Sequence, residues 1–327
     1  MLAGLEEYAR RDGDNFLLAN VVSFRCLFDL EVGRVASARA RLAETIVLLG
    51  ASGYPEDHFS LVALRAGLRG WTGAPAIDAK EAAIAIDACR SATFGAGVDL
   101  WQRAELLGYL AIGDFSSAFD AARQLLDADP EPAACVLADL VEAAVHAKEL
   151  STAATLRDQL VRRSQLLDTP LGAGLRELVE AALADDPEPH YERAIHQLAR
   201  ADAPMYTGRA HLQFGEWLRR RRRRTEATTH LERAAHLFGT QNAAAWSARA
   251  ARELTPLGIA TVAPHHQAVP LTPQEEAIAN LAGRGATNQE IADHLFLSAS
   301  TVDYHLRKVF RKLDLTSRRQ LAAALHH

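Results

Sequence analysis

Polar side chains between positions 300 and 311 recur at the spacing of one helical face. If this segment is a helix, one face carries Ser300, Asp303, Tyr304, Arg307 and Arg311. An arginine can donate two hydrogen bonds to guanine O6 and N7, and an aspartate can accept one from cytosine N4. A tyrosine can contact a thymine methyl group or a phosphate. The spacing of Asp303, Tyr304 and Arg307 therefore predicts contacts with the edges of base pairs.

A second set of residues has the chemistry to bind phosphate. Basic side chains neutralise phosphates and supply affinity without sequence preference, and the segment offers Lys308, Arg311, Lys312, Arg318 and Arg319. Amides and hydroxyls at helix starts also favour an anion, and the expected starts hold Thr287, Asn288, Ser298 and Thr301. Ser300 and Ser317 complete the contacts that we expect to position the protein on the backbone.

Short helices must hold these residues in place. The expected third helix, about 299–313, has an apolar back made by Val302, Leu306, Val309 and Leu313, at spacings of 4, 3 and 4. Capping signals mark four helix starts, namely Thr272 with Pro273 and Glu275, Thr287 with Glu290, Ser298, and Ser317 with Gln320. Four short helices in about 55 residues are typical of a helix-turn-helix module.

The whole segment resembles one known family. "LTPQE…LAGRGATNQEIADHLFLSASTVDYHLRKVFRKL…SRRQLA" is similar to the C-terminal DNA-binding domain of LuxR-family transcriptional regulators. The resemblance implies that the third helix enters the major groove, with base contacts at Asp303, Tyr304 and Arg307. It also implies that the fourth helix, near Ser317–Leu325, supports dimerisation. Asp314 replaces the glycine that usually ends the third helix, and we expect a small stability cost from it.

Residues 1–256 predict helices in pairs. Three sets of apolar residues have spacings of 4, 3 and 4, namely Leu17–Val21–Phe24–Phe28, Leu100–Ala104–Leu107–Ala111 and Ala227–Leu231–Ala234–Phe238. A break followed by alanine recurs at Ala38, Ala118, Ala153 and Ala227. Gly215, Leu218, Ala227, Leu231 and Ala234 fit the tetratricopeptide pattern, in which small residues let two helices cross closely. An irregular helical bundle is the alternative.

Six consecutive arginines, Arg219–Arg224, fall inside the last predicted helix pair. Six consecutive helical residues would point in all directions and could not form one phosphate-binding face. We therefore expect Arg219 and Arg220 to end a helix, and Arg221–Arg224 to form the turn and the lead-in to the next. Contact of the run with DNA or an acidic partner is the alternative.

The chain thus divides into a helical-repeat domain at 1–256, a linker at 257–270 and a helix-turn-helix domain at 271–327. The linker has two prolines and no charged residue. Residues 209–258 resemble the segment before this domain in the large ATP-binding, MalT-like LuxR regulators, which also carry an ATPase module. No lysine of this chain follows a glycine, so we expect no phosphate loop, either because the chain is a short family member or because it is part of a longer protein.

Several classes of protein are disfavoured. A net charge of −5 argues against a simple basic nucleic-acid coat, and no stretch is long and apolar enough to predict a membrane span. The start, "MLAGLEEYARRDGD", lacks the basic-then-apolar order of a signal peptide. Cys26, Cys89 and Cys135 lie far apart, which indicates buried free thiols. His265 and His266 have no third ligand nearby, so we expect no metal and no cofactor. The "DHFS" stretch at 57–60 cannot form a catalytic triad from adjacent residues, and we expect no enzyme.

These observations predict an all-α, cytoplasmic transcriptional regulator, and activation is the commoner role in the family. The expected partners are double-stranded DNA, a second copy of the chain on DNA, RNA polymerase, and an effector or protein partner of the repeats. The alternative is an interaction scaffold whose helix-turn-helix serves for dimerisation. The basic residues around Arg307 favour the regulator, because a purely structural module does not need them.

Overall fold

The computed structural model describes residues 2–258, apart from 56, 74–78, 92–94, 129–131 and 168, and parts of the C-terminal segment. Those parts are 278–279, 281–283, 286–295, 301–303, 306 and 309. Contacts between Cα atoms divide the chain into two compact units, Met1–Thr261 and Val262–His327. The described residues form helices and no strand, which confirms the all-α prediction. Among the described helices, none is long and apolar enough to cross a membrane.

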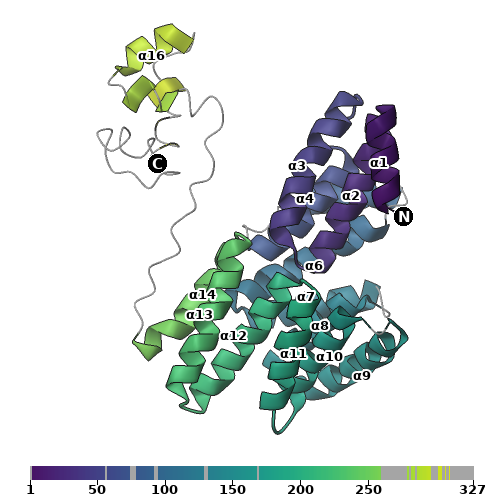
Figure 1. Ribbon diagram of the computed structural model, residues 1–327, viewed down its shortest axis with the longest axis vertical. Coiled ribbons are helices and arrows are strands. Elements are labelled where there is room, and N and C mark those ends of the chain that lie inside the picture. Colours follow the sequence, from purple (N-terminus) through teal and green to yellow (C-terminus); the bar gives the residue numbers. More distant parts are fainter. Residues whose placement is uncertain are drawn as a thin grey trace. The chain divides into compact units, whose positions relative to one another are not determined.

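Helices of the first unit pack mainly against their neighbours along the chain (Figure 1). Their bounds are α1 Leu2–Asp12, α2 Asn15–Glu31, α3 Val35–Ala51, α4 Phe59–Thr72, α5 Ala79–Ser91, α6 Gly95–Ile112, α7 Phe115–Ala128, α8 Ala134–His146, α9 Leu150–Leu167, α10 Pro170–Leu183, α11 Glu188–Arg200, α12 Pro204–Arg220, α13 Arg224–Thr240 and α14 Ala244–Leu254. A short 3-10 helix, η1 Thr255–Leu257, follows, and the second unit contains α16 Asn288–Leu295.

One type of turn joins helices throughout the first unit. A residue with positive φ follows the first helix, and the next helix starts two residues later; these residues are Gly13, Gly33, Gly113, Lys148, Asp202, Arg222 and Asn242. At Arg222, its amide donates to Arg219 O at 3.0 Å and the Arg223 amide donates to Leu218 O at 3.0 Å. This pair of bonds is the Schellman motif, which satisfies carbonyls at a helix end.

The turn explains the predicted recurrence of a break followed by alanine. Ala38, Ala118, Ala153 and Ala227 each lie five residues after a left-handed turn residue, and all four are fully buried. Their positions as inward-facing residues of a second helix are therefore confirmed. The structure is consistent with helical hairpins, whereas the likeness to tetratricopeptide repeats stays a prediction.

Close helix crossing is clearest between α12 and α13. A Cβ atom on Gly215 would lie 2.7 Å from Leu231 Cγ, so only glycine fits there. The predicted faces Ala227–Leu231–Ala234–Phe238 and Leu100–Ala104–Leu107–Ala111 are both buried, as expected.

The predicted inner face of the helix over 15–31 is only half right, because Val21 is buried and Leu17 is partly buried. Phe24 and Phe28 are 55% and 57% exposed, and α2 instead buries Leu18, Val22 and Leu30 among others. The helical period was correct, but α2 has apolar residues on more than one side. Its neighbours α1, α3 and α4 cover the face next to the predicted one.

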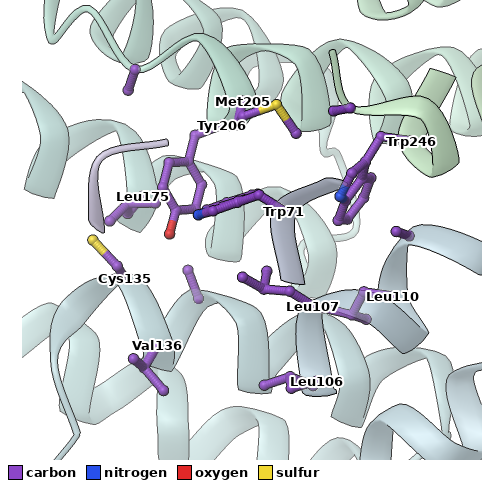
Figure 2. Close-up of a cluster of buried hydrophobic side chains, with 14 of the residues drawn as sticks. Trp71, Leu106, Leu107, Leu110, Cys135, Val136, Leu175, Met205, Tyr206 and Trp246 are labelled. Carbon is purple, nitrogen blue, oxygen red and sulfur yellow. The ribbon is translucent and has the colours of Figure 1, made fainter. Parts of the chain in front are cut away.

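The centre of the first unit is a core that takes side chains from α4, α6, α8, α10, α12 and α14, among other helices (Figure 2). Trp71 of α4 meets the ring of Tyr206 of α12 edge to face at 5.4 Å, and its indole nitrogen donates to Leu30 O at 2.8 Å. Trp246 of α14 and leucines of α6 complete the apolar surroundings.

Early and late helices of this unit also touch. The turn between α2 and α3 packs closely on the start of α12. A Cβ atom added to Gly33 would lie only 2.8 Å from Met205 Cβ. Arg34 Nε donates to Asp202 O at 2.8 Å, and the Ala36 amide donates to Gln241 Oε1 at 3.0 Å. The array is therefore closed on itself by contacts across more than 160 positions of sequence.

Candidate nucleic-acid interface

The second helix of the predicted helix-turn-helix is α16, and it begins with the expected capping box. Glu290 Oε2 accepts hydrogen bonds from the Thr287 amide at 2.6 Å and the Thr287 hydroxyl at 2.8 Å. The Glu290 amide donates to Thr287 Oγ1 at 3.3 Å. These bonds satisfy amides at the helix start, and they hold the pKa of Glu290 below its ordinary value. Thr287 is exposed and Asn288 is half-buried.

The third helix has the predicted apolar back. Val302, Leu306 and Val309 are helical and buried. They form one cluster with Ile278, Ala279, Ala282, Ile291 and Ala292. Thr301 and Asp303, which flank Val302, are half-buried. The described part of this helix thus has the apolar back that a groove-binding helix needs.

Most of the predicted contact residues lie outside the described residues. They are Ser298, Ser300, Tyr304, Arg307, Lys308, Arg311, Lys312, Ser317, Arg318 and Arg319. The same is true of Leu313, Asp314 and the caps at Thr272 and Gln320. The contacts of these residues with bases and phosphates stay predictions.

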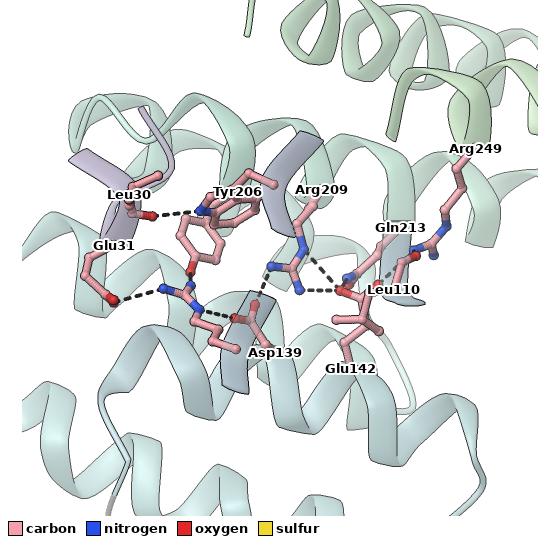
Figure 3. Close-up of polar contacts among 11 residues, drawn as sticks. Leu30, Glu31, Leu110, Asp139, Glu142, Tyr206, Arg209, Gln213 and Arg249 are labelled. Carbon is pink, nitrogen blue, oxygen red and sulfur yellow. Dashed lines mark hydrogen bonds and ion pairs between the residues drawn. The ribbon is translucent and has the colours of Figure 1, made fainter. Parts of the chain in front are cut away.

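A chain of alternating charges crosses the core of the first unit, and sequence reasoning missed it. Seven side chains alternate in sign, in the order Glu31, Arg103, Asp139, Arg209, Glu142, Arg249 and Glu216. Figure 3 shows these ion pairs from Glu31 at one end to Arg249 near the other. The members come from α2, α6, α8, α12 and α14, so the chain ties together helices that are far apart in sequence. We call it the charge chain.

Each interior member of the charge chain contacts two opposite charges. Asp139 accepts from Arg103 at 2.8 Å and also from Arg209, and Arg249 donates to Glu142 at 3.0 Å and to Glu216 at 3.0 Å. Burial alone would raise the pKa of Glu142, but Arg209 and Arg249 outweigh it and lower the pKa to about 2. One signal in the sequence was available, since Asp139 and Glu142 interrupt an otherwise apolar run over 134–145 of α8.

The arginine run forms the turn that the sequence predicted. α12 ends at Arg220, and α13 begins at Arg224. Arg219 pairs with Glu253 at 2.6 Å, and Arg223 pairs with Glu188 and Glu226. Two arginines of the run, Arg219 and Arg223, therefore form ion pairs within the first unit.

Other candidate sites yield little chemistry. His58 Nδ1 lies 2.8 Å from Ser60 Oγ in the turn that precedes α4, and burial lowers the pKa of His58. Cys26, Cys89 and Cys135 are buried free thiols, as predicted. Within the described ranges, no group of three or more His, Cys, Asp or Glu residues could hold a metal ion.

A capped second helix and a third helix with an apolar back are features that a helix-turn-helix domain needs. Residues 269–325 match the family described as bacterial regulatory proteins, luxR family. The C-terminal segment is therefore a LuxR-family helix-turn-helix domain.

Known proteins resemble this segment. The chain is 47% identical over 51 residues to the putative HTH-type transcriptional regulators Mb0914c of Mycobacterium bovis and Rv0890c of Mycobacterium tuberculosis, covering 16% of this chain and 6% of each of those proteins. It is 48% identical over 48 residues to the transcriptional regulatory protein ComA of Bacillus subtilis, covering 15% of this chain and 22% of that protein. No solved structure matches the chain significantly.

Proposed function

We propose that this chain is a sequence-specific, DNA-binding transcriptional regulator whose helical-repeat unit senses an effector or a protein partner. One observation carries the proposal, namely the match of residues 269–325 to the luxR regulatory family. The capping box of α16 and the apolar back at Val302, Leu306 and Val309 support it. The three relatives described above are named as transcriptional regulators.

In this proposal, Asp303, Tyr304 and Arg307 contact bases, and Lys308, Arg311, Lys312, Arg318 and Arg319 contact phosphates. Thr287, Asn288, Ser298, Ser300, Thr301 and Ser317 position the domain on the DNA backbone. The protein acts in the cytoplasm, binds its operator as a homodimer and activates transcription with RNA polymerase. It acts without enzymatic chemistry of its own.

Selection of bound sequences from a random duplex pool at physiological salt tests the proposal, because salt weakens non-specific phosphate contacts. We expect an enriched motif with two-fold symmetry. Recovery of no motif from the folded chain would contradict sequence-specific binding. It would favour the scaffold in which the helix-turn-helix only dimerises.

Variants of the selected complex test the residue roles. Arg307→Ala should weaken specific binding by about 1–3 kcal/mol and relax one base position. Lys312→Ala should weaken binding to all sequences alike and reduce the salt slope by about 1. Arg221→Ala, in the exposed turn of the first unit, is the matched control and should change neither. If Arg307→Ala leaves specific binding unchanged, the predicted base-contact face is wrong.

A further inference from the structure

The charge chain ends in two very different places. Glu31, at one end, has a side chain that is 35% exposed, so water solvates its charge. Glu216, at the other end, has a side chain that is only 9% exposed. Arg249 donates to Glu216 Oε1, whereas no described residue donates to Oε2. The charge chain therefore contains four carboxylates and three guanidinium groups. At its buried end, the negative charge of Glu216 is less well compensated than that of Glu31 at the other end.

A pocket of about 300 Å³ lies at this buried end, between α8, α10 and α12. Its volume falls at the lower limit of the range typical of small-molecule sites. Glu142, Gln213 and Glu216 line it on one side, and Val141 and Leu178 are among its apolar walls. The buried end of the charge chain thus opens into a space of ligand size.

The polar groups that line the interior of the pocket include several acceptors. The Tyr191 side chain is buried, and its hydroxyl forms no hydrogen bond with the described residues. Gln213 donates one of its two amide hydrogens to Glu142 at 2.8 Å, and its amide oxygen is an acceptor. His146 stacks on Phe115 at 3.7 Å, and burial lowers the pKa of His146.

We propose that this pocket binds a small organic ammonium compound with an apolar body, whose ammonium group pairs with Glu216. A bound ammonium group would extend the charge chain by one member, because it would place a positive charge next to Glu216. An ammonium has three donors and no acceptor, which matches Glu216, Gln213 and Tyr191. Arg220 and Arg221 also line the pocket, but both are exposed, where water screens their charge.

A regulatory role for this site rests on the function proposed above, whereas the binding itself rests on the geometry alone. Ligand in the pocket would contact α8, α10 and α12 at once and stabilise their packing. Binding of the amine is therefore measured on the full chain without DNA, and DNA selection is carried out without the amine. A failure to bind the amine would not affect the DNA selection, and a failure of the DNA selection would not affect amine binding. The two proposals are therefore tested separately.

Titration calorimetry with three probes that share one aromatic body tests the site. The probes are phenethylammonium, 2-phenylethanol and phenylacetate. We expect phenethylammonium to bind at least about tenfold more tightly than the other two, as a charged hydrogen bond in a buried site should provide. Equal binding of the alcohol, or no binding of the ammonium at millimolar concentration, would overturn the proposal.

Three variants locate the probe. Glu216→Gln should weaken phenethylammonium at least about tenfold, and Tyr191→Phe about threefold. Tyr191→Phe removes a hydroxyl for which the described residues provide no hydrogen bond, so it should keep the fold. Glu31→Gln makes the same chemical change at the other end of the charge chain and should leave binding unchanged. Equal loss in Glu31→Gln and Glu216→Gln, or unchanged binding in Tyr191→Phe and Glu216→Gln, would show that the probe binds elsewhere.

Discussion

The two units of this chain build their interiors from different chemistry. The described core of the C-terminal unit is apolar, with Ile278, Ile291, Val302, Leu306 and Val309 among its members. The interior of the repeat unit also contains alanines and leucines, but charged side chains run through its centre. Buried ion pairs rarely add net stability compared with apolar residues of the same volume. The difference indicates that charge serves the repeat unit by fixing which helices meet, whereas the small unit only needs a rigid back for its surface.

The largest expected effect is the removal of an interior member of the charge chain. Arg209→Ala leaves Asp139 and Glu142 buried with one partner fewer each, and should lower the free energy of unfolding by about 3–5 kcal/mol. Urea unfolding followed by tryptophan fluorescence measures this, because all four tryptophans lie in the first unit. Arg157→Ala removes a surface ion pair and is the control, with an expected loss under about 1 kcal/mol. Similar losses in the two variants would mean that the charge chain stabilises the first unit no more than a surface ion pair does.

Next in size is a cavity in the apolar core of the C-terminal unit. Leu306→Ala should cost about 2–4 kcal/mol and reduce operator binding by unfolding the small unit. The tryptophan signal of the first unit should not move. Leu106→Ala, at an equally buried position of α6, should do the reverse. A shift of the tryptophan transition in Leu306→Ala would mean that the two units do not unfold separately.

Buried polar groups should also make the repeat unit sensitive to acid. His211 Nδ1 lies 2.9 Å from His230 Nδ1, and burial together with His230 and Arg233 lowers the pKa of His211 to about 4. The folded state thus favours neutral His211, which stabilises the protein above pH 6.5, and this stability is lost as the pH falls toward 4. We expect a loss of about 2 kcal/mol between pH 7.5 and pH 5 that is absent in His211→Gln. The control is His236→Gln, at an exposed position of α13, and it should keep the loss.

The smallest expected effect lies in the turns that the repeat unit uses throughout. Arg222 has a φ of 63°, where a side chain is strained and glycine is not. Arg222→Gly should therefore stabilise the first unit by about 0.5–1 kcal/mol in the same urea assay. Arg221→Gly, one residue earlier at a φ of −81°, should instead destabilise slightly. Stabilisation by both variants would point to charge repulsion within the run as the cause.

The sequence predicted those features that depend on neighbours along the chain. The capping box at Thr287 and Glu290, the buried side of the third helix, and the turn at Arg221–Arg223 all follow from local spacing, and the structure confirms them. The Phe24 and Phe28 half of the predicted face of α2 was wrong, because the choice between apolar stripes depends on which helices cover them. The charge chain was not foreseen for the same reason. Its members join positions 31 to 249, and no periodicity within one helix reveals a partner so distant.

Contacts between the first and the last hairpins have a consequence for how the repeat unit unfolds. In an open array each repeat touches only its neighbours, so the ends can fray and unfolding can proceed stepwise. Here the turn at Gly33 packs against Met205, and the charge chain joins α2 to α14 through the core of the first unit. Release of α2 and α3, or of α12 to α14, would break contacts between these two groups of helices, so they share the free energy of opening. Helices α2 to α14 should lose their structure in one cooperative step, and α2 and α14 should exchange their amide hydrogens nearly as slowly as the central helices. The first helix, α1, packs mainly on α2 and should exchange faster.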